Sequence, residues 1–204
     1  GFAYSPNNGD DVSYTFDGGT TWTHYPNGTF GGAGISSIHF PLSNSSIGFA
    51  VSAWGGNIFK TTNGGISWTQ ISQPTSQDLN DVFFTSTNNG YIIGSNFILE
   101  TLDGGTNWTT TNSNLGGKKI KVINSDIYLL NSDSIRISTN NGASFIAMTG
   151  TINGLNNLHI LSSTSGYCVG GSGRIFKLGS TTAINESYFT LNHLKVFPNP
   201  ASTH

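Results

Sequence analysis

An octapeptide occurs four times in this chain, and its recurrence constrains the fold more than any other feature. The copies are TFDGGTTW (15–22), TTNGGISW (61–68), TLDGGTNW (101–108) and STNNGASF (138–145). Their acidic or amide residues, Asp17, Asn63, Asp103 and Asn140, lie 46, 40 and 37 residues apart. A period of about 40 residues indicates a repeat architecture in which each unit is one supersecondary structure.

Short segments rich in β-branched and aromatic residues flank each octapeptide, with Gly, Asn and Ser between them. In a complete repeat unit, three such segments precede the octapeptide and one follows it. This pattern is typical of antiparallel strands joined by turns. No segment shows a sustained helical period. The sequence therefore predicts an all-β fold, a β-propeller built from four-stranded antiparallel blades.

The blades predicted from the repeat are not all complete. We expect a partial blade first, three complete blades at about 35–71, 79–111 and 119–149, and three strands of a last blade at 155–178. Both partial blades carry second and third strands, so they cannot merge into one. Residues 1–180 are therefore expected to be part of a larger propeller, and closure with five blades is the alternative.

The octapeptide has the composition of a hydrogen-bonded hairpin. An Asp or Asn side chain can accept backbone N–H groups across a tight turn, while glycines supply positive φ. A hydroxyl or amide near its end can add a bond, and the last aromatic residue can pack beneath the turn. Residues assigned these structural roles are Asp17, Trp22, Asn63, Trp68, Asp103, Trp108, Asn140 and Phe145.

Calcium binding is the alternative for these turns, but the number of ligands is too small. Two copies offer one carboxylate each and two offer only an amide, whereas calcium takes about six to eight oxygen ligands. The pattern Ser/Thr-x-Asp/Asn-x-Gly-x-Thr/Ser-Trp resembles the Asp-box, or bacterial neuraminidase repeat. That resemblance implies a propeller similar to sialidases and to the photosystem II stability and assembly factor. We expect no metal ion and no cofactor.

Composition narrows the possible partners. Only 9% of the residues are charged and the formal net charge is −2, which gives no electrostatic basis for binding nucleic acid. No apolar run approaches the roughly 20 residues of a membrane-spanning helix, so no membrane insertion is expected. The single cysteine, Cys168, excludes an internal disulfide and aligns with Ala50 and Ile92, as a core residue would.

The loops that join the second strand to the third, and one blade to the next, share one face of a propeller. Loop residues without an equivalent in the other blades are therefore the candidates for ligand binding. Trp54 has no aromatic equivalent in the other blades, and an exposed indole suits a sugar or a peptide. Further candidates are Tyr4, Asp10, Asp11 and Arg174, and the glycine-rich loop 25–34 offers Tyr25 and Phe30.

Several polar residues of the predicted first strands receive a structural interpretation instead. His39 and His159 align with Phe83, so we expect them to pack rather than to form a catalytic pair. The segment KKIK (118–121) is expected to be solvated where its strand begins.

The blade pattern stops near residue 181, and we expect a linker at 181–193. The segment LKVFPNPAS follows, in which Pro198, Asn199 and Pro200 stiffen an extended turn. It resembles the start of the C-terminal sorting domain of the type IX secretion system of Bacteroidetes, here at 194–204. The resemblance implies recognition by the type IX machinery and a secreted or cell-surface location.

Three function classes remain after these observations. The favoured hypothesis is a secreted or surface propeller that binds a glycan or a surface protein without catalysis. A fragment of a secreted glycoside hydrolase is the alternative, but sialidases need an arginine triad and the chain has only Arg136 and Arg174. Other glycosidases need two carboxylates about 5–10 Å apart. An assembly factor would need a photosynthetic host, which the tail does not favour.

Overall fold

The computed structural model describes residues 1–5, 12–42, 44–72, 74–131, 134–148, 154–163, 165–171, 174–180 and 187–191. Asp10 and Asp11 lie outside the described residues, as do Pro198, Asn199 and Pro200 of the predicted sorting signal. Regular structure within the described ranges is β-strand, without an α-helix. None of these ranges therefore contains a helix that could cross a bilayer.

The strands form five antiparallel sheets, each made from consecutive segments of the chain. The first sheet contains β1 (Phe2–Tyr4), β2 (Val12–Tyr14) and β3 (Thr23–His24). The second contains β4 (Ile35–His39), β5 (Gly48–Ser52), β6 (Ile58–Thr61) and β7 (Thr69–Ser72). The third contains β8 (Asp81–Phe84), β9 (Gly90–Ile93), β10 (Ile98–Thr101) and β11 (Thr109–Asn112).

The last two sheets have four strands each. The fourth contains β12 (Lys119–Ile123), β13 (Asp126–Leu130), β14 (Ile135–Ser138) and β15 (Ile146–Ala147). The fifth contains β16 (Leu155–Ser162), β17 (Ser165–Gly170), β18 (Ile175–Ser180) and β19 (Ser187–Leu191).

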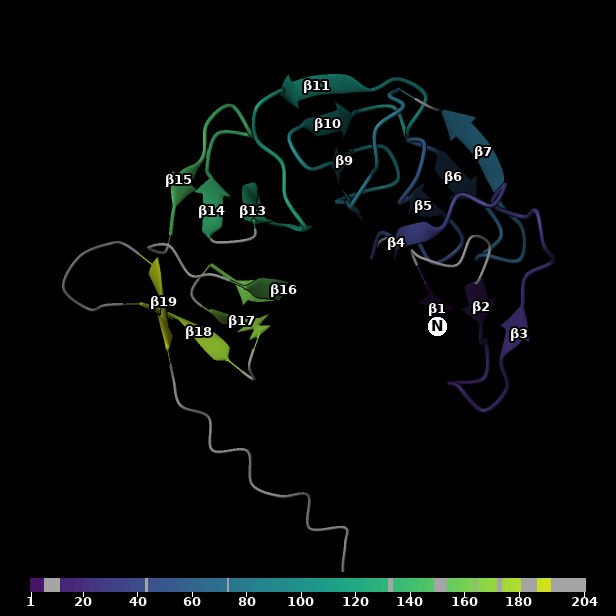
Figure 1. Cartoon of the computed structure of the whole chain (residues 1–204), viewed down its shortest axis with the longest axis horizontal. Coiled ribbons are helices and arrows are strands. Elements are labelled where there is room, and N and C mark those ends of the chain that lie inside the picture. Colours follow the sequence, from purple (N-terminus) through teal and green to yellow (C-terminus); the bar gives the residue numbers. More distant parts are fainter. Residues whose placement is uncertain are drawn as a thin grey trace, which may run out of the picture.

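The sheets follow one another around an arc that is open between the first and the last sheet (Figure 1). Strands β4, β8, β12 and β16, which we call the inner strands, each form one edge of their sheet, and each contacts the next along the arc. This arrangement is that of propeller blades, so the predicted all-β propeller with four-stranded antiparallel blades is confirmed. The open arc is also compatible with part of a larger propeller.

The octapeptides form the predicted hairpins between the third and fourth strands. In the first copy, Asp17 Oδ1 accepts the backbone N–H of Thr21 at 2.9 Å, and Oδ2 accepts its hydroxyl at 2.6 Å. The hydroxyl of Thr15 donates to Asp17 Oδ1 at 2.7 Å and accepts the N–H of Gly19 at 2.9 Å. Both side chains thus hold the turn closed from within.

The amide copies keep this geometry. Asn140 Oδ1 accepts the N–H of Ser144 at 2.9 Å, and its Nδ2 donates to the Ser144 hydroxyl at 2.9 Å. Asn141 replaces the first glycine of the other copies and adopts φ 54°, in the left-handed region where Gly104 has φ 68°. Asparagine tolerates this conformation better than most residues, so the turn survives the replacement.

The hydrophobic core is divided among the interfaces between neighbouring blades. Phe49 and Val51 of the second blade pack with Leu79 and Phe84 of the third, and the two phenylalanine rings stack at 3.5 Å between centroids. Equivalent clusters join the third blade to the fourth and the fourth to the fifth. Cys168 lies fully buried in the last cluster, as predicted.

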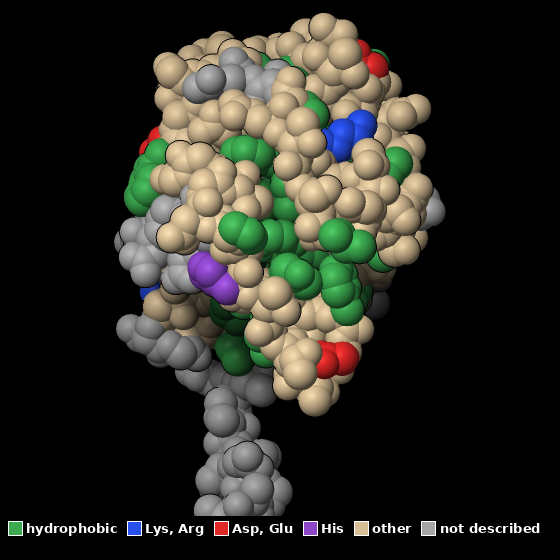
Figure 2. All heavy atoms as spheres, turned by 90° about the vertical axis from the view of Figure 1, so that its right-hand side faces the viewer, with side chains coloured by type: hydrophobic (Ala, Val, Ile, Leu, Met, Phe, Trp, Pro, Cys, Tyr) green, Lys and Arg blue, Asp and Glu red, His purple; other side chains and the backbone are tan. Residues whose placement is uncertain are grey.

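The terminal aromatic residues of the hairpins pack on these interfaces with one exception. Trp68, Trp108 and Phe145 are partly buried against clusters shared with the preceding blade. Trp22 is 49% exposed, contrary to the prediction, because no preceding blade lies within the described residues. Figure 2 shows the side of the molecule that lies at the right of Figure 1, where hydrophobic side chains gather and charged ones are few.

The last blade differs from the sequence prediction. Residues 187–191 form β19, which pairs with β18 from Ser180↔Ser187 to Phe176↔Leu191, whereas a linker was expected over 181–193. The fifth blade therefore has four strands rather than three. The repeat did not reveal this strand because the segment before it has lost the Asp-box residues.

Candidate binding site

The four inner strands bring residues of equal repeat position side by side around the axis. In each of these blades, two residues of the inner strand pair with aromatic or aliphatic residues of the following strand. Together these residues form two layers. The first layer consists of Ser37, Asp81, Lys119 and Asn157. The second layer, two positions later in each strand, consists of His39, Phe83, Lys121 and His159. Alternate residues of a strand share a face, so both layers are presented to the same space.

Asp81 is the centre of the first layer. Its Oδ1 accepts the hydroxyl of Ser37 at 2.6 Å, and its Oδ2 accepts the backbone N–H of Ile120 at 2.9 Å. The ammonium of Lys119 lies 3.3 Å from Oδ1. The carboxylate, on a residue only 5% exposed, therefore connects three blades and is already supplied with donors.

Phe83 is the centre of the second layer. The His39 ring lies 4.4 Å from the Phe83 ring between centroids, and Lys121 Nζ lies 4.9 Å from the same centroid. His39 Nε2 lies 3.0 Å from the carbonyl oxygen of Phe84, which can only accept. This bond places the proton of the neutral imidazole on Nε2 and leaves Nδ1 as an acceptor.

Burial acts on His39 and Lys121 of this layer. It lowers the pKa of His39, and the nearby Lys121 charge lowers that pKa further. Burial also lowers the pKa of the Lys121 ammonium, against the opposing attraction of Asp81. Both groups are therefore held where their charged forms are less favourable than in water.

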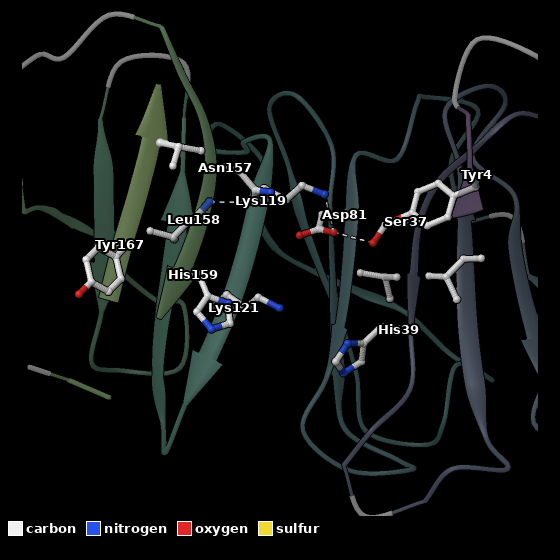
Figure 3. A pocket seen from close by; sticks show the side chains of 13 residues that line it. Tyr4, Ser37, His39, Asp81, Lys119, Lys121, Asn157, Leu158, His159 and Tyr167 are labelled. Atoms are coloured by element: carbon white, nitrogen blue, oxygen red, sulfur yellow. Dashed lines mark hydrogen bonds and ion pairs between the residues drawn. The ribbon is translucent and has the colours of Figure 1, made fainter. Parts of the chain in front are cut away.

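The two layers line two neighbouring cavities. One has a volume of about 390 Å³ and contains the first layer with Tyr4 and Tyr167; the other has about 440 Å³ and a more apolar lining. His39, Lys121 and His159 line both cavities. Figure 3 shows all three side chains below the Asp81–Lys119 pair, with Lys121 and His159 on one side of the view and His39 on the other.

Positive charge is in excess among the described residues that line these cavities. They include one carboxylate, Asp81, and two ammonium groups, Lys119 and Lys121. Asp81 lies within ion-pair distance of Lys119, and none of the described carboxylates lies within that distance of Lys121. The arrangement can therefore accept an anion at the second layer.

The residues predicted from sequence are only partly brought together. Tyr4 lies half-buried in the cavity wall beside the first layer. Trp54 is 44% exposed in the β5–β6 loop and does not line either cavity. Arg174 is also outside them, and its Nε donates to the carbonyl of Gly171 at 3.1 Å. Ligand binding by Trp54 and Arg174 stays a prediction.

The expectation that Tyr25 and Phe30 are available for a ligand was wrong. Tyr25 and Phe30 are buried in the core between the first two blades and are not available in the loop. His39 packs on the Phe83 ring as expected, and His39 and His159 also line the central cavities, which was not expected. Polar residues at one repeat position of all four inner strands were the signal that could have revealed this site.

The loop face carries a further cavity of about 390 Å³ between the third and fourth blades. Its wall includes Asn80, whose Nδ2 donates to the carbonyl of Gly117 at 2.8 Å, and Lys118. No group of three His, Cys, Asp or Glu side chains in the described ranges is arranged to hold a metal ion.

Comparisons with known proteins agree with this architecture. The family model of the photosynthesis system II assembly factor YCF48 matches residues 60–147, from β6 to β15. No curated protein sequence matches the chain significantly.

Solved structures match over most of the chain at low identity. YCF48 bound to D1 peptide has 20% identity and a TM-score of 0.59 over 76% of this chain and 54% of that one. YCF48 from Cyanidioschyzon merolae has 17% identity and a TM-score of 0.56 over 79% and 57%. The chain thus spans little more than half the length of these relatives.

A glycoside hydrolase gives a similar result. The Niastella koreensis GH74 enzyme has 18% identity and a TM-score of 0.60 over 94% of this chain and 29% of its own length. These likenesses are in the fold, and together with the four Asp-box hairpins they show that the chain is a β-propeller with repeats of the bacterial neuraminidase type.

Proposed function

We propose that this chain is part of a secreted or cell-surface propeller that binds a protein or a glycan without chemical turnover. The central cavity carries the proposal, because polar and basic side chains from successive blades converge on it. Its one described carboxylate, Asp81, is engaged by Ser37, Ile120 and Lys119. A glycosidase would need a second carboxylate about 5–10 Å away.

A protein ligand has additional support from the comparisons. A YCF48 structure of similar fold is described as bound to a D1 peptide. Ligand sites are concave and carry a few convergent polar groups, and the cavity lined by several blades of this chain has that form.

Binding is tested by screening the full-length protein against glycan arrays and against surface proteins of its host, with parallel assays for release of reducing sugar. We expect saturable binding to one class of ligand without turnover. Release of sugar from any polysaccharide would replace this proposal with a fragment of a hydrolase. A double variant, Lys121→Met with Tyr4→Ala, should weaken binding if the central cavity is the site.

Export by the type IX system is a separate part of the proposal and is supported by the sequence LKVFPNPAS alone. In a bacterium with this system, protein lacking residues 194–204 should accumulate inside the cell while the intact protein reaches the surface or medium. Equal export of both would refute this assignment.

A further inference from the structure

We propose that the second layer of the central cavity binds the carboxylate of a ligand that carries an apolar group next to it. Lys121, His39 and His159 would surround the carboxylate, and the apolar wall beyond them would receive the neighbouring group. The proposal rests on the binding function above and specifies the ligand chemistry of the same cavity.

Lys121 is the first reason for an anion. Its ammonium is partly buried over the Phe83 ring, and no described carboxylate lies within ion-pair distance of it. A buried charge without a counter-charge is unfavourable, and a ring face compensates for it only in part. In the first layer the equivalent lysine, Lys119, has its carboxylate within the chain, in Asp81.

The histidines are the second reason. His39 uses Nε2 for the carbonyl of Phe84, so protonation would add an N–H at Nδ1 and not elsewhere. His159 occupies the equivalent position on β16 and lines both cavities with it. The Lys121 ammonium, the His159 ring and, once protonated at Nδ1, the His39 ring line the same cavities and can donate to a carboxylate, which has about four acceptor sites.

The wall beyond the layer determines what is attached to the carboxylate. The larger cavity continues along Phe83, Val122 and Ile160, and its lining is mainly apolar. A sugar acid would place hydroxyl groups there without partners, which is unfavourable. A carboxylate next to an alkyl or aromatic group fits both halves of the cavity.

Two sources could supply this chemistry: a free carboxylic acid, or an acidic side chain beside an apolar residue in a peptide. Phenylacetate and a blocked Asp-Phe dipeptide represent them, and phenylacetamide is the uncharged control. Each is titrated into the full chain while amide and imidazole NMR signals are followed. Affinities on the order of millimolar are expected for ligands of this size.

Phenylacetate should shift the imidazole signals of His39 and His159, whereas phenylacetamide should not. If both phenylacetate and the dipeptide bind, a carboxylate next to an apolar group is sufficient for binding. If only the dipeptide binds, the ligand of this site is a peptide. Binding of neither acid, or equal binding of phenylacetamide, would overturn the proposal.

Lys121→Met should weaken phenylacetate binding by about tenfold or more, because it removes a charge-assisted bond and keeps the stem over Phe83. Lys60→Met is the matched control, since Lys60 also lies over a phenylalanine ring, 5.3 Å from the Phe49 centroid, but outside the cavities. Lys121→Arg should retain binding. Thermal unfolding checks that each variant is folded, and equal affinities for the two methionine variants would contradict the inference.

The affinity should also rise as pH falls below the ordinary histidine pKa of about 6.5, because a bound carboxylate favours the protonated His39, whose pKa is lowered by burial. The charged groups facing His39 are Lys121 and Asp81, with Lys119 and His159 nearby. His39→Gln should flatten this pH dependence while keeping the charge of Lys121. If the chain binds phenylacetate but no glycan or protein in the screens, the proposed function is refuted and the carboxylate site is not.

Discussion

At the scale of single residues, each Asp-box turn depends on a threonine or serine hydroxyl as well as on its acid or amide. This hydroxyl lies two positions before the acid or amide. Thr101 is almost fully buried, and its hydroxyl donates to Asp103 Oδ1 at 2.9 Å while accepting the N–H of Gly105 at 3.0 Å. The motif showed that the hydroxyl recurs, but only the structure shows that it closes the turn from inside.

Thr101→Val should lower the free energy of unfolding by about 1–3 kcal/mol, because it leaves the buried N–H of Gly105 without its partner. Urea denaturation measures the loss, and Thr109→Val on the exposed strand β11 is the control. A loss no larger than that of the control would show that the hydroxyl is dispensable.

The two acidic copies of the turn should differ from the amide copies in their response to acid. Hydrogen bonds from Thr21 lower the pKa of Asp17, and those from Asn107 lower the pKa of Asp103. Their stabilising effect is therefore present above the unfolded pKa of about 3.9 and is lost as pH falls through the folded pKa.

An Asp17→Asn, Asp103→Asn double variant should be less stable than the parent at pH 7, with the difference shrinking below about pH 4. The geometry of the turn should persist, since Asn63 and Asn140 already adopt it. Denaturation at a series of pH values measures the effect, and a difference independent of pH would contradict it.

At the scale of elements, the inner strands are connected by polar bonds as well as by apolar packing. Asp81 on β8 accepts from Ser37 on β4 and from Ile120 and Lys119 on β12. Each strand could be predicted from its β-branched composition, but the contacts between strands about 40 residues apart required the blade geometry.

Asp81→Ala should therefore destabilise the fold by roughly 3 kcal/mol, because the donors on β4 and β12 lose a buried acceptor. Asp78→Ala, at an exposed position three residues earlier, should change stability little. Chemical denaturation of both variants gives the comparison, and equal losses would show that Asp81 does not join the blades.

The cavity was harder to predict than the strands for a related reason. Alignment with Phe83 suggested that His39 and His159 are packing residues, and His39 does pack on the Phe83 ring, yet all three residues also line a cavity. Repeat alignment identifies positions that are equivalent, whereas the direction each position faces depends on the placement of the blades. The fold could thus be deduced from periodicity alone, whereas the site required the polar repeat position of the inner strands to be combined with the placement of the blades.

At the scale of the whole molecule, residues at the same repeat position are buried in one blade and exposed in another. Phe49 and Tyr167 occupy equivalent places on β5 and β17, where they pair with His39 and His159. Phe49 is covered by the next blade, while Tyr167 is 38% exposed because no described blade follows the fifth.

Phe49→Ala should cost about 3–5 kcal/mol of stability, as expected for a buried aromatic residue. Tyr167→Ala should cost less than about 1 kcal/mol in the same chain. Denaturation curves of the two variants test this, and a large loss at Tyr167 would indicate that another surface covers the last blade in solution.

The open arc has a consequence for how the molecule comes apart. Each blade is supported by its immediate neighbours, so the blades at the ends have support on one side and those in the middle on both. Amide protons of β1–β3 and β16–β19 should then exchange with deuterated solvent before those of β8–β11. Unfolding would proceed inward, so the third blade, where Asp81 joins the second blade to the fourth, would open last.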